Sequence, residues 1–397
     1  MCDFELITLL KKLVSIPSVN PEDTDDSDIT GEQRIAEFLA DYLEQKEFQV
    51  QWMEQEPGRP NIIASFGSES ASRTLLLESH LDTVSVHGMK RPPFTPQIEE
   101  GRLYGRGACD TKGPMAAVLH ALEPSLLRKL SEGDCRIIFV GAMGEEKGNQ
   151  GAAYLAGQGI GADEAIILEP TECSIVHAHK GALWFRVEVV GVAGHGSDPA
   201  RGVNAIEALG QAVQKLKAQT ELDRENYHSD ILGQPTINFG VIKGGSAVNI
   251  VPDHCLMEVD RRYLPDEDVG ILLENIKSIF STLKKEDKIK GFEFHIIKDS
   301  IPFLTSTTSP LVNRLQRSCK EVGVEATFQG SSWYSDAGHF SQTCSDVVVL
   351  GPGSIKQAHT ADEYIELESL QRGYEILTCF LSDWVDEMKD LNPSDKI

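Results

Sequence analysis

The sequence predicts an α/β fold: a mostly parallel sheet with helices on both faces, interrupted by a smaller ferredoxin-like domain. Three observations support this prediction. Short β-rich runs alternate with helical segments up to about residue 170 and again near the C-terminus, which is typical of parallel sheets. The middle of the chain follows a different order, β-α-β-β-α-β. A length of 397 residues also exceeds what one hydrophobic core usually serves, so two domains are expected.

The first predicted domain begins with two amphipathic helices, because apolar residues recur there at helical spacing. These residues are Phe4, Ile7, Leu10 and Val14 in the first helix, and Ile35, Phe38, Leu39 and Leu43 in the second. Strands are expected at Phe48–Trp52, Asn61–Phe66, Thr74–Glu78, Cys135–Val140, Glu164–Leu168 and Val347–Leu350. Further helices are expected over Gly113–Leu130, near Gly151–Ala156, and over Leu311–Val322 and Leu367–Met388. Glu99-Glu100 before Gly101 is typical of a hairpin turn, and the tail after Asp390 is expected to fray.

The second predicted domain occupies residues 180–300, which leaves residues 1–179 and 301–397 for the first. Its expected strands are Ala182–Val190, Thr236–Ile242, Cys255–Arg261 and Phe292–Ile297. Its expected helices are Val203–Ala218 and Val269–Leu283. In chain order these segments give the ferredoxin-like arrangement.

The composition is that of a globular protein, with 41% apolar and 25% charged residues. A formal net charge of −24 disfavours partners bound by neutralising phosphates, so neither nucleic acid nor an anionic membrane surface is expected. No run approaches the roughly 18–20 apolar residues of a membrane span, and the opening MCDFELITLLKKLVSI lacks a secretory signal. The eight cysteines are scattered without a Cys-x-x-Cys pair, which indicates free thiols and a cytoplasmic location.

Side chains of the types that bind metals follow several predicted strands or lie in short loops. They are His80 after Thr74–Glu78, Glu145 and Glu146 after Cys135–Val140, Glu169 after Glu164–Leu168, and Asp110 in the loop GRGACDTKG. In open α/β sheets ligands bind outside the carboxyl ends of the strands. We therefore expect these side chains to converge although they are far apart in sequence.

Two pairs of residues indicate how such a site would be organised. Asp82, two residues after His80, can accept the second N–H of a metal-bound imidazole. Adjacent carboxylates such as Glu145 and Glu146 point in different directions, so one can bind metal while the other acts as general base over a bound water. In isolation, the same residues would be a surface histidine and a solvated acidic loop.

Asp110 and His359 complete the predicted site. One carboxylate between two cations can bridge them, and two metals about 3.5–4 Å apart lower the pKa of a shared water to about 7. In isolation, Asp110 would be a helix-capping residue and His359 an ordinary loop histidine. Zinc-type sites use mixed N and O ligands, however, and the sequence otherwise offers only one well-placed imidazole for two ions.

Nine short motifs, spread from the first predicted helix to the last, resemble those of one enzyme family. They are LVSIPSVNP, SHLDTV, YGRGACDTKGPMAA, GEEKG, LEPT, GHGSDPARGVNAI, GGSAVNIVPD, DRR and GPGSIKQAHTADEY. The family is the two-zinc metallohydrolases that include acetylornithine deacetylase, succinyl-diaminopimelate desuccinylase, aminoacylases and glutamate-type carboxypeptidases. The last motif, with Gln357 before His359, is closest to its acetylornithine deacetylase form.

The resemblance implies a role for each candidate residue. One ion would be held by His80, Asp110 and Glu169, and the other by Asp110, Glu146 and His359. Glu145 corresponds to the general base, and Asp82 to the carboxylate behind His80. His195 matches a histidine that, in relatives, reaches across a dimer to the scissile carbonyl. Asn249 and Arg262 match groups that hold the substrate carboxylate.

The same resemblance implies the activity and assembly. Residues 1–179 and 301–397 would form the catalytic domain, and residues 180–300 a lid and dimerisation domain. Two Zn²⁺ ions per subunit are expected, with Co²⁺ or Mn²⁺ as substitutes. The expected substrate is a small N-acyl amino acid, N-acetylornithine above others, which is cleaved to ornithine and acetate in arginine biosynthesis. The expected assembly is a homodimer through the lid domain.

Other functions remain open at this stage. SSWYSDAGHF departs from the common deacetylase wording, and Gly144 stands where relatives often carry Asp. A desuccinylase, an aminoacylase, or a dipeptidase or carboxypeptidase of the same family is therefore the alternative. A two-metal phosphoesterase is disfavoured because few cations accompany the acidic loops to meet a phosphate. A catalytically inactive binding protein is disfavoured because every ligand position and the base are filled.

Overall fold

The computed structural model describes residues 2–390, so the predicted frayed tail after Asp390 lies outside the described residues. The chain divides into two compact units. The first unit comprises Met1–His177, Leu304–Gln329 and Ser335–Ile397. The second comprises Ala178–Phe303 and Gly330–Tyr334. Each unit has a hydrophobic core of its own.

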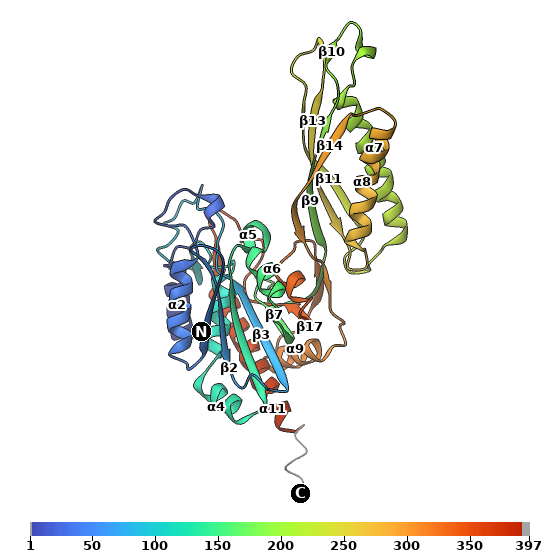
Figure 1. Cartoon of the computed structure of the whole chain (residues 1–397). Helices are drawn as coiled ribbons and strands as arrows, with labels where there is room; N and C mark the ends of the chain where they lie inside the picture. Colours follow the sequence, from blue (N-terminus) through green and yellow to red (C-terminus); the bar gives the residue numbers. More distant parts are fainter. Residues whose placement is uncertain (1, 391–397) are drawn as a thin grey trace. The chain divides into compact units, whose positions relative to one another are not determined.

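A nine-stranded sheet forms the centre of the first unit (Figure 1). Its strands, in spatial order, are β1 (Gln49–Glu56), β2 (Arg59–Phe66), β6 (Cys135–Ala142), β3 (Arg73–His80), β7 (Ala162–Ile167), β17 (Cys344–Val349), β8 (Ile175–His179) and β15 (Phe303–Leu304), with β16 (Phe328–Ser331) paired to β8. The four strands β6, β3, β7 and β17 run parallel, whereas β1 and β2 are antiparallel. The predicted α/β class with a mostly parallel central sheet is confirmed.

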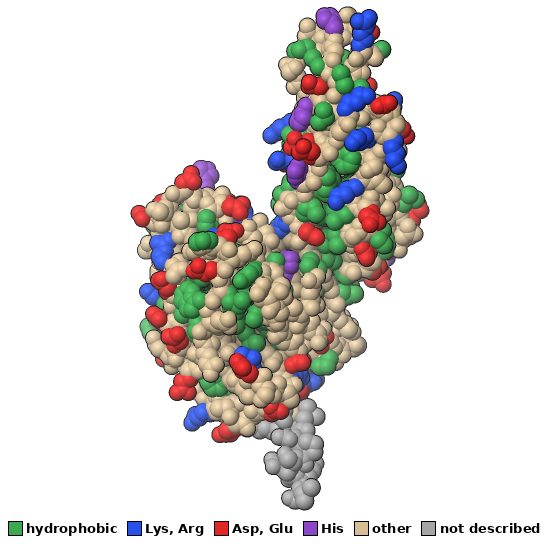
Figure 2. Space-filling view, in the orientation of Figure 1, with side chains coloured by type: hydrophobic (Ala, Val, Ile, Leu, Met, Phe, Trp, Pro, Cys, Tyr) green, Lys and Arg blue, Asp and Glu red, His purple; other side chains and the backbone are tan. Residues whose placement is uncertain are grey.

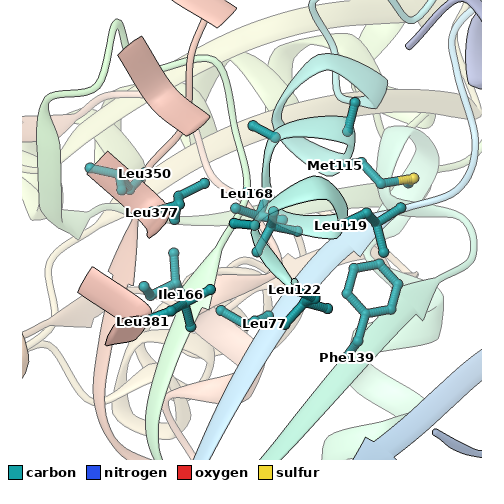
Figure 3. Packing of buried hydrophobic residues seen from close by; sticks show 14 of the residues in the cluster. Leu77, Met115, Leu119, Leu122, Phe139, Ile166, Leu168, Leu350, Leu377 and Leu381 are labelled. Carbon is teal, nitrogen blue, oxygen red and sulfur yellow. The ribbon is translucent and has the colours of Figure 1, made fainter. Parts of the chain in front are cut away.

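Helices pack against this sheet through leucine-rich faces. The main ones are α1 (Phe4–Val14), α2 (Gln33–Glu44), α3 (Lys112–Ala121), α9 (Pro310–Glu321) and α11 (Leu367–Asp390). In Figure 3, Met115 and Leu119 of α3 lie beside Leu77 and Phe139 of the sheet, and Leu377 of α11 joins the same cluster. This burial holds α3, which follows the Asp110 loop, firmly over the strands.

The single helix predicted over Gly113–Leu130 is wrong in one respect. The structure has two helices there, α3, which ends at Ala121, and α4 (Pro124–Glu132). Pro124 disfavours a helical conformation of the preceding residue, and Glu123 accordingly has an extended ψ of 155°. Pro124 then occupies the first turn of α4, where its missing N–H costs nothing.

A small three-stranded sheet links the C-terminal segment to the loop that carries Asp110. It consists of β4 (Gln97–Glu99), β5 (Arg102–Tyr104) and β18 (Tyr364–Glu366). The predicted hairpin at Glu99-Glu100-Gly101 joins the first two strands, with positive φ at Glu100 and Gly101. Strand β18 pairs antiparallel with β5, which brings the residues just after His359 beside the residues just before Asp110.

The second unit has the predicted β-α-β-β-α-β order. Its elements are β9 (Gly181–Val190), α7 (Ala205–Asn226), β11 (Thr236–Gly244), β13 (His254–Tyr263), α8 (Val269–Lys285) and β14 (Gly291–Ser300). The strands form an antiparallel sheet in the order β11-β13-β9-β14, and both helices lie on one of its faces (Figure 1). A short pair, β10 (Gly194–His195) and β12 (Ile250–Val251), extends beyond one end of this sheet.

The surface mixes charges of both signs. Figure 2 shows acidic and basic side chains interspersed with neutral ones over the visible face of each unit. Among the described residues, no helix combines the length and apolar character that crossing a membrane would require.

Candidate metal centre

The five predicted metal ligands come together at one edge of the central sheet. His80 is the last residue of β3, Glu169 follows β7, and Glu146 lies in α5 (Glu145–Gly148), which follows β6. Asp110 and His359 enter from loops. The predicted strand ended at Glu78, but β3 continues to His80, which pairs with Ala142 at the end of β6. The carboxyl ends of parallel strands thus gather the ligands.

Asp110 lies between the two histidines. His80 Nε2 is 3.0 Å from Asp110 Oδ1 and 3.9 Å from Glu169 Oε1. His359 Nε2 is 3.3 Å from Asp110 Oδ2 and 2.9 Å from Glu146 Oε2. Each oxygen of Asp110 therefore faces a different imidazole, which is the arrangement expected of a carboxylate that bridges two ions.

The residues present fit a pair of divalent cations. The ligand atoms of His80, Asp110 and Glu146 all lie within 4.8 Å of one another. Glu146 Oε1 is buried and has no hydrogen-bond partner, although a buried carboxylate oxygen normally has one. The donor set of imidazole nitrogens and carboxylate oxygens suits zinc, cobalt or manganese.

The electrostatics of the site show what a cation would replace. Burial and the adjacent Asp110 charge raise the pKa of Glu146 to about 7 and that of Glu169 well above its usual range. Hydrogen bonds to Asp110 and Glu146 raise the pKa of His359 to about 11. Burial alone would raise the pKa of Asp110, but hydrogen bonds from His359 and His80 hold it below its usual range. Bound protons thus occupy positions from which a metal would displace them.

The orientation of His80 is fixed by Asp82, although not in the predicted way. His80 Nδ1 is 2.9 Å from the backbone oxygen of Asp82 and 3.6 Å from its carboxylate Oδ1. The nearer acceptor is therefore the backbone carbonyl of the residue whose side chain was expected. Either acceptor holds the proton on Nδ1 and directs Nε2 towards the other ligands.

The Asp82 carboxylate has a second function that the sequence did not reveal. It accepts hydrogen bonds from the Asn20 side chain at 2.7 Å and from the backbone N–H groups of Glu145 and Glu146 at 3.0 and 3.2 Å. A carboxylate at the first N–H groups of a helical turn satisfies donors that have no partner within it. Asp82 thereby ties the end of β3 to the turn that presents Glu145 and Glu146.

The turn before Glu145 contains Gly144, which stands where relatives often carry Asp. Gly144 has φ of 71°, in the left-handed region that glycine adopts without steric cost. A Cβ at this position would lie 2.8 Å from Gln150 Oε1 and 3.0 Å from Arg59 Nη2. Glycine therefore suits this tight turn between β6 and α5.

Glu363 is a further site residue that sequence reasoning missed. It is 1% exposed and lies four residues after His359. At 2.6–3.0 Å, its two oxygens accept hydrogen bonds from the Arg106 guanidinium and the backbone N–H groups of Gly107, Cys109 and Asp110. The segment that carries His359 thus clamps the loop that carries Asp110. The only sequence signal was its place in the motif HTADEY, in which only His359 was assigned.

The other three predicted site residues belong to the second unit. His195 ends β10 and is exposed, and its Nδ1 accepts hydrogen bonds from the N–H and hydroxyl groups of Ser197. The backbone oxygen of Asn249 accepts the Gly196 N–H at 2.8 Å, so His195 and Asn249 lie on adjoining turns. Arg262 pairs with Asp260 at 2.8 Å and lies over the Tyr334 ring.

Within the second unit, Arg262 lies far from His195 and Asn249. Arg262 pairs with Ala182 at one end of the β13–β9 ladder, and His254 pairs with Val190 at the other end. At about 3.3 Å per residue these ends are about 25 Å apart. His195 and Asn249 lie beyond the His254 end.

Comparisons with known proteins show which family and which fold the chain shares. The model of peptidase family M20/M25/M40 matches residues 76–383. Acetylornithine deacetylase of Proteus mirabilis is 31% identical over 384 residues, covering 94% of each chain. A tripeptidase from Staphylococcus aureus has a similar fold (TM-score 0.77, 23% identity, 97% and 100% coverage). So does a Bacillus subtilis protein described as a dinuclear metal-binding peptidase (TM-score 0.68, 14% identity, 97% and 98% coverage).

Proposed function

We propose that this chain, which belongs to peptidase family M20/M25/M40, is a two-metal deacetylase. The proposed reaction is hydrolysis of N-acetylornithine to ornithine and acetate. That it is a hydrolytic enzyme follows from the family. The observation that carries the two-metal assignment is the position of Asp110, with one oxygen towards His80 and the other towards His359. N-acetylornithine is proposed as the substrate by likeness to the acetylornithine deacetylase that is 31% identical to this chain.

Zinc is the proposed metal, two ions per subunit, with Co²⁺ or Mn²⁺ as substitutes. The first ion would be held by His80, Asp110 and Glu169, and the second by Asp110, Glu146 and His359. When bound, the ions would polarise the substrate carbonyl and lower the pKa of a shared water.

The protein groups then have separate tasks in the proposed reaction. Glu145 takes a proton from the attacking water as the water oxygen bonds to the amide carbon. His195 donates a hydrogen bond to the carbonyl oxygen as negative charge develops there. The C–N bond breaks, and Glu145 returns the proton to the leaving amine nitrogen. Arg262 and Asn249 are assigned to the substrate carboxylate.

A homodimer is part of the proposal, and the shape of the second unit supports it. Arg262 lies at one end of the β13–β9 ladder, which is about 25 Å long, and His195 lies beyond the other end. One copy of this unit cannot place both side chains on one small amino acid. A second copy that supplies His195 would resolve the conflict. The measurement is the molar mass in solution, together with restoration of activity when His195→Ala and Arg262→Ala variants are mixed.

The decisive experiment is a substrate panel with purified, metal-analysed protein. Its members are N-acetylornithine, N-succinyl-diaminopimelate, N-acetylmethionine, a dipeptide and a phosphate monoester. The proposal expects the highest kcat/KM for N-acetylornithine. Preference for another amide would change the substrate but keep the reaction class, and cleavage of the phosphate ester alone would remove both. Glu145→Gln, which keeps the metal ligands, should retain metal and lose about 100-fold to 10,000-fold in kcat.

A cytoplasmic location is also proposed. It rests on the eight cysteines, all of which are free thiols. Cell fractionation followed by detection of the native protein tests it.

A further inference from the structure

A buried hydrogen-bonded chain leads from Glu145 away from the metal ligands. The Asn149 side-chain nitrogen Nδ2 lies 3.0 Å from Glu145 Oε1 and 2.8 Å from Asp336 Oδ1. All three side chains are buried, Asn149 completely. One amide group thus connects the proposed general base to a carboxylate from a distant part of the same unit.

The chemistry of these groups fixes the direction of both hydrogen bonds. An asparagine NH₂ group has two hydrogens to donate, and an ionised carboxylate can only accept. Because both neighbours of Nδ2 are carboxyl oxygens, the orientation of the amide is determined. The Asp336 bond keeps the amide in place, and the Glu145 bond restricts rotation of the base carboxylate.

A simpler explanation for Asn149 is its backbone. Asn149 lies between α5 and α6 (Gln150–Gly157) with φ of 56°, and its backbone N–H donates a hydrogen bond to the backbone carbonyl of Glu145 at 3.2 Å. Asparagine and glycine are common in this left-handed position after a helical turn. That role makes no use of the side chain, however, and burying an amide is favourable only when its hydrogen bonds are made.

The carboxylate that anchors Asn149 belongs to the segment SSWYSDAGHF. This segment departs from the family wording, yet Asp336 stands at the start of α10 (Ala337–Phe340) and is 1% exposed. It makes no side-chain cap to that helix. Its Oδ1 instead accepts the Asn149 amide, and its carboxyl group also interacts with that of the buried Glu78.

We propose that Asn149, anchored by Asp336, is a positioning residue that holds the Glu145 carboxylate in the orientation from which it takes the proton of the attacking water. This inference rests on the proposed role of Glu145 as general base. Asn149 acts only through Glu145, so its removal should lower kcat and leave KM and metal binding unchanged.

The test begins with two variants of Asn149 in the metal-loaded enzyme. Asn149→Gly keeps the left-handed backbone and removes the amide, and Asn149→Asp keeps the shape and removes the donor. Each is expected to lower kcat about 10-fold to 100-fold, with KM within about twofold of wild type. Metal content by elemental analysis should stay near the wild-type value in both variants. The thermal unfolding midpoint should stay near wild type in Asn149→Gly, whereas Asn149→Asp should have a lower midpoint because it buries a third carboxyl group between two others.

A matched control separates the amide from the backbone. Asp287 is another non-glycine residue with positive φ just past a helix, α8, but its side chain is exposed. Asp287→Gly should leave kcat, KM and metal content unchanged. This control shows the effect of placing glycine at a positive-φ position whose side chain does not contact the proposed general base.

Variants of Asp336 test the anchor. Asp336→Asn still offers an oxygen to Asn149 and should keep most of the activity, whereas Asp336→Ala should match Asn149→Gly. The double variant Asn149→Gly/Asp336→Ala should lose no more than either single variant, because both act through one bond.

Three outcomes would overturn the proposal. Wild-type kcat in Asn149→Gly would show that only the backbone matters, and wild-type kcat in Asp336→Ala would show that the anchor is dispensable. Loss of metal or a large drop in unfolding midpoint in both Asn149 variants would show a structural role. Failure of the proposed function has a different signature, since wild-type protein would then leave the whole amide panel uncleaved or Glu145→Gln would remain active.

Discussion

At the scale of single residues, the site is held by carboxylates that bind no metal. Asp82 and Glu363 both use their oxygens on backbone N–H groups of the segments that present ligands. These bonds align the ligands before a cation arrives. Removing a supporting partner of this kind lowers metal affinity by about 10-fold to 100-fold.

Glu363→Gln tests this arrangement. One amide oxygen would replace two carboxylate oxygens, and the new NH₂ group would face N–H donors of the Asp110 loop. We expect a loss of about 2 to 4 kcal/mol in the free energy of unfolding, because buried donors lose their acceptor. Denaturant titration measures the loss of stability, and metal titration measures the accompanying loss of metal affinity. Glu366→Gln in the same segment is the control, since the exposed pair of Glu366 with Arg102 is worth at most about 1 kcal/mol.

Metal affinity should depend on pH in a defined direction. Burial and Asp110 raise the pKa of Glu146 to about 7, and partners Asp110 and Glu146 raise that of His359 to about 11. Their protons must leave as a cation binds, so the apparent affinity should rise as the pH increases through 7 and fall on acidification. Calorimetry in buffers of different ionisation enthalpy should show proton release. Affinity that is constant between about pH 6 and 8 would contradict the ligand assignment.

At the scale of elements, helix ends are set by residues with a clear local signature. The Asp3 carboxylate accepts the N–H groups of Glu5 and Leu6 at the start of α1, at 2.7 and 3.2 Å. These backbone hydrogen bonds, with His120, lower the pKa of Asp3. The contribution to stability is therefore present above the pKa of Asp3 in the unfolded chain, about 3.9, and disappears as the pH falls below it.

Asp3→Ala should lower the free energy of unfolding by about 1 kcal/mol at pH 7. The difference from wild type should vanish at strongly acidic pH, where the carboxyl group is protonated in both states. Asp3→Ser, which keeps a capping oxygen, should restore most of the loss. Equal stability of the Ala and Ser variants would show that the cap contributes nothing.

Elements were predictable where a short-range pattern determines them. Alternation along β9 and β13 and helical spacing in α1, α2 and α8 were visible in the sequence, and the fold class follows from their order. The break between α3 and α4 was missed because apolar residues continue across Pro124. Strands β8, β15, β16 and β18 are short and paired with distant segments, so their positions depend on the sheet more than on their own residues.

The site shows the same division. The ligands follow apolar strands or fall in distinctive motifs, so their convergence could be anticipated from His80, Asp110 and Glu146. The supporting residue Asn20 donates to the Asp82 carboxylate, and Glu363 and Asp336 accept hydrogen bonds from backbone or amide groups far along the chain. Such bonds leave no spacing rule in a single sequence, because one partner is a main-chain atom or lies in another loop.

At the scale of the whole molecule, the metals should contribute to stability as well as catalysis. The side chains of Asp110, Glu146 and Glu169 are nearly buried and lie close together, so removing the cations leaves carboxylates that repel one another or must take up protons. Any ligand that binds only the folded state stabilises it, by about 4 kcal/mol at 1,000 times its dissociation constant. Chelation should lower the unfolding midpoint, and adding zinc back should restore it. An unchanged midpoint after verified metal loss would contradict this prediction.

The clamp of Glu363 on the Asp110 loop has a consequence for synthesis of the protein. One ligand of the proposed centre and the residue that fixes its shared aspartate both come from the last tenth of the chain. A ribosome must therefore extrude the chain past Glu363 before the two-metal centre can be assembled. A nascent chain that has not reached His359 lacks a proposed ligand, and truncation before it also removes α11, whose buried side chains pack in the core of the first unit.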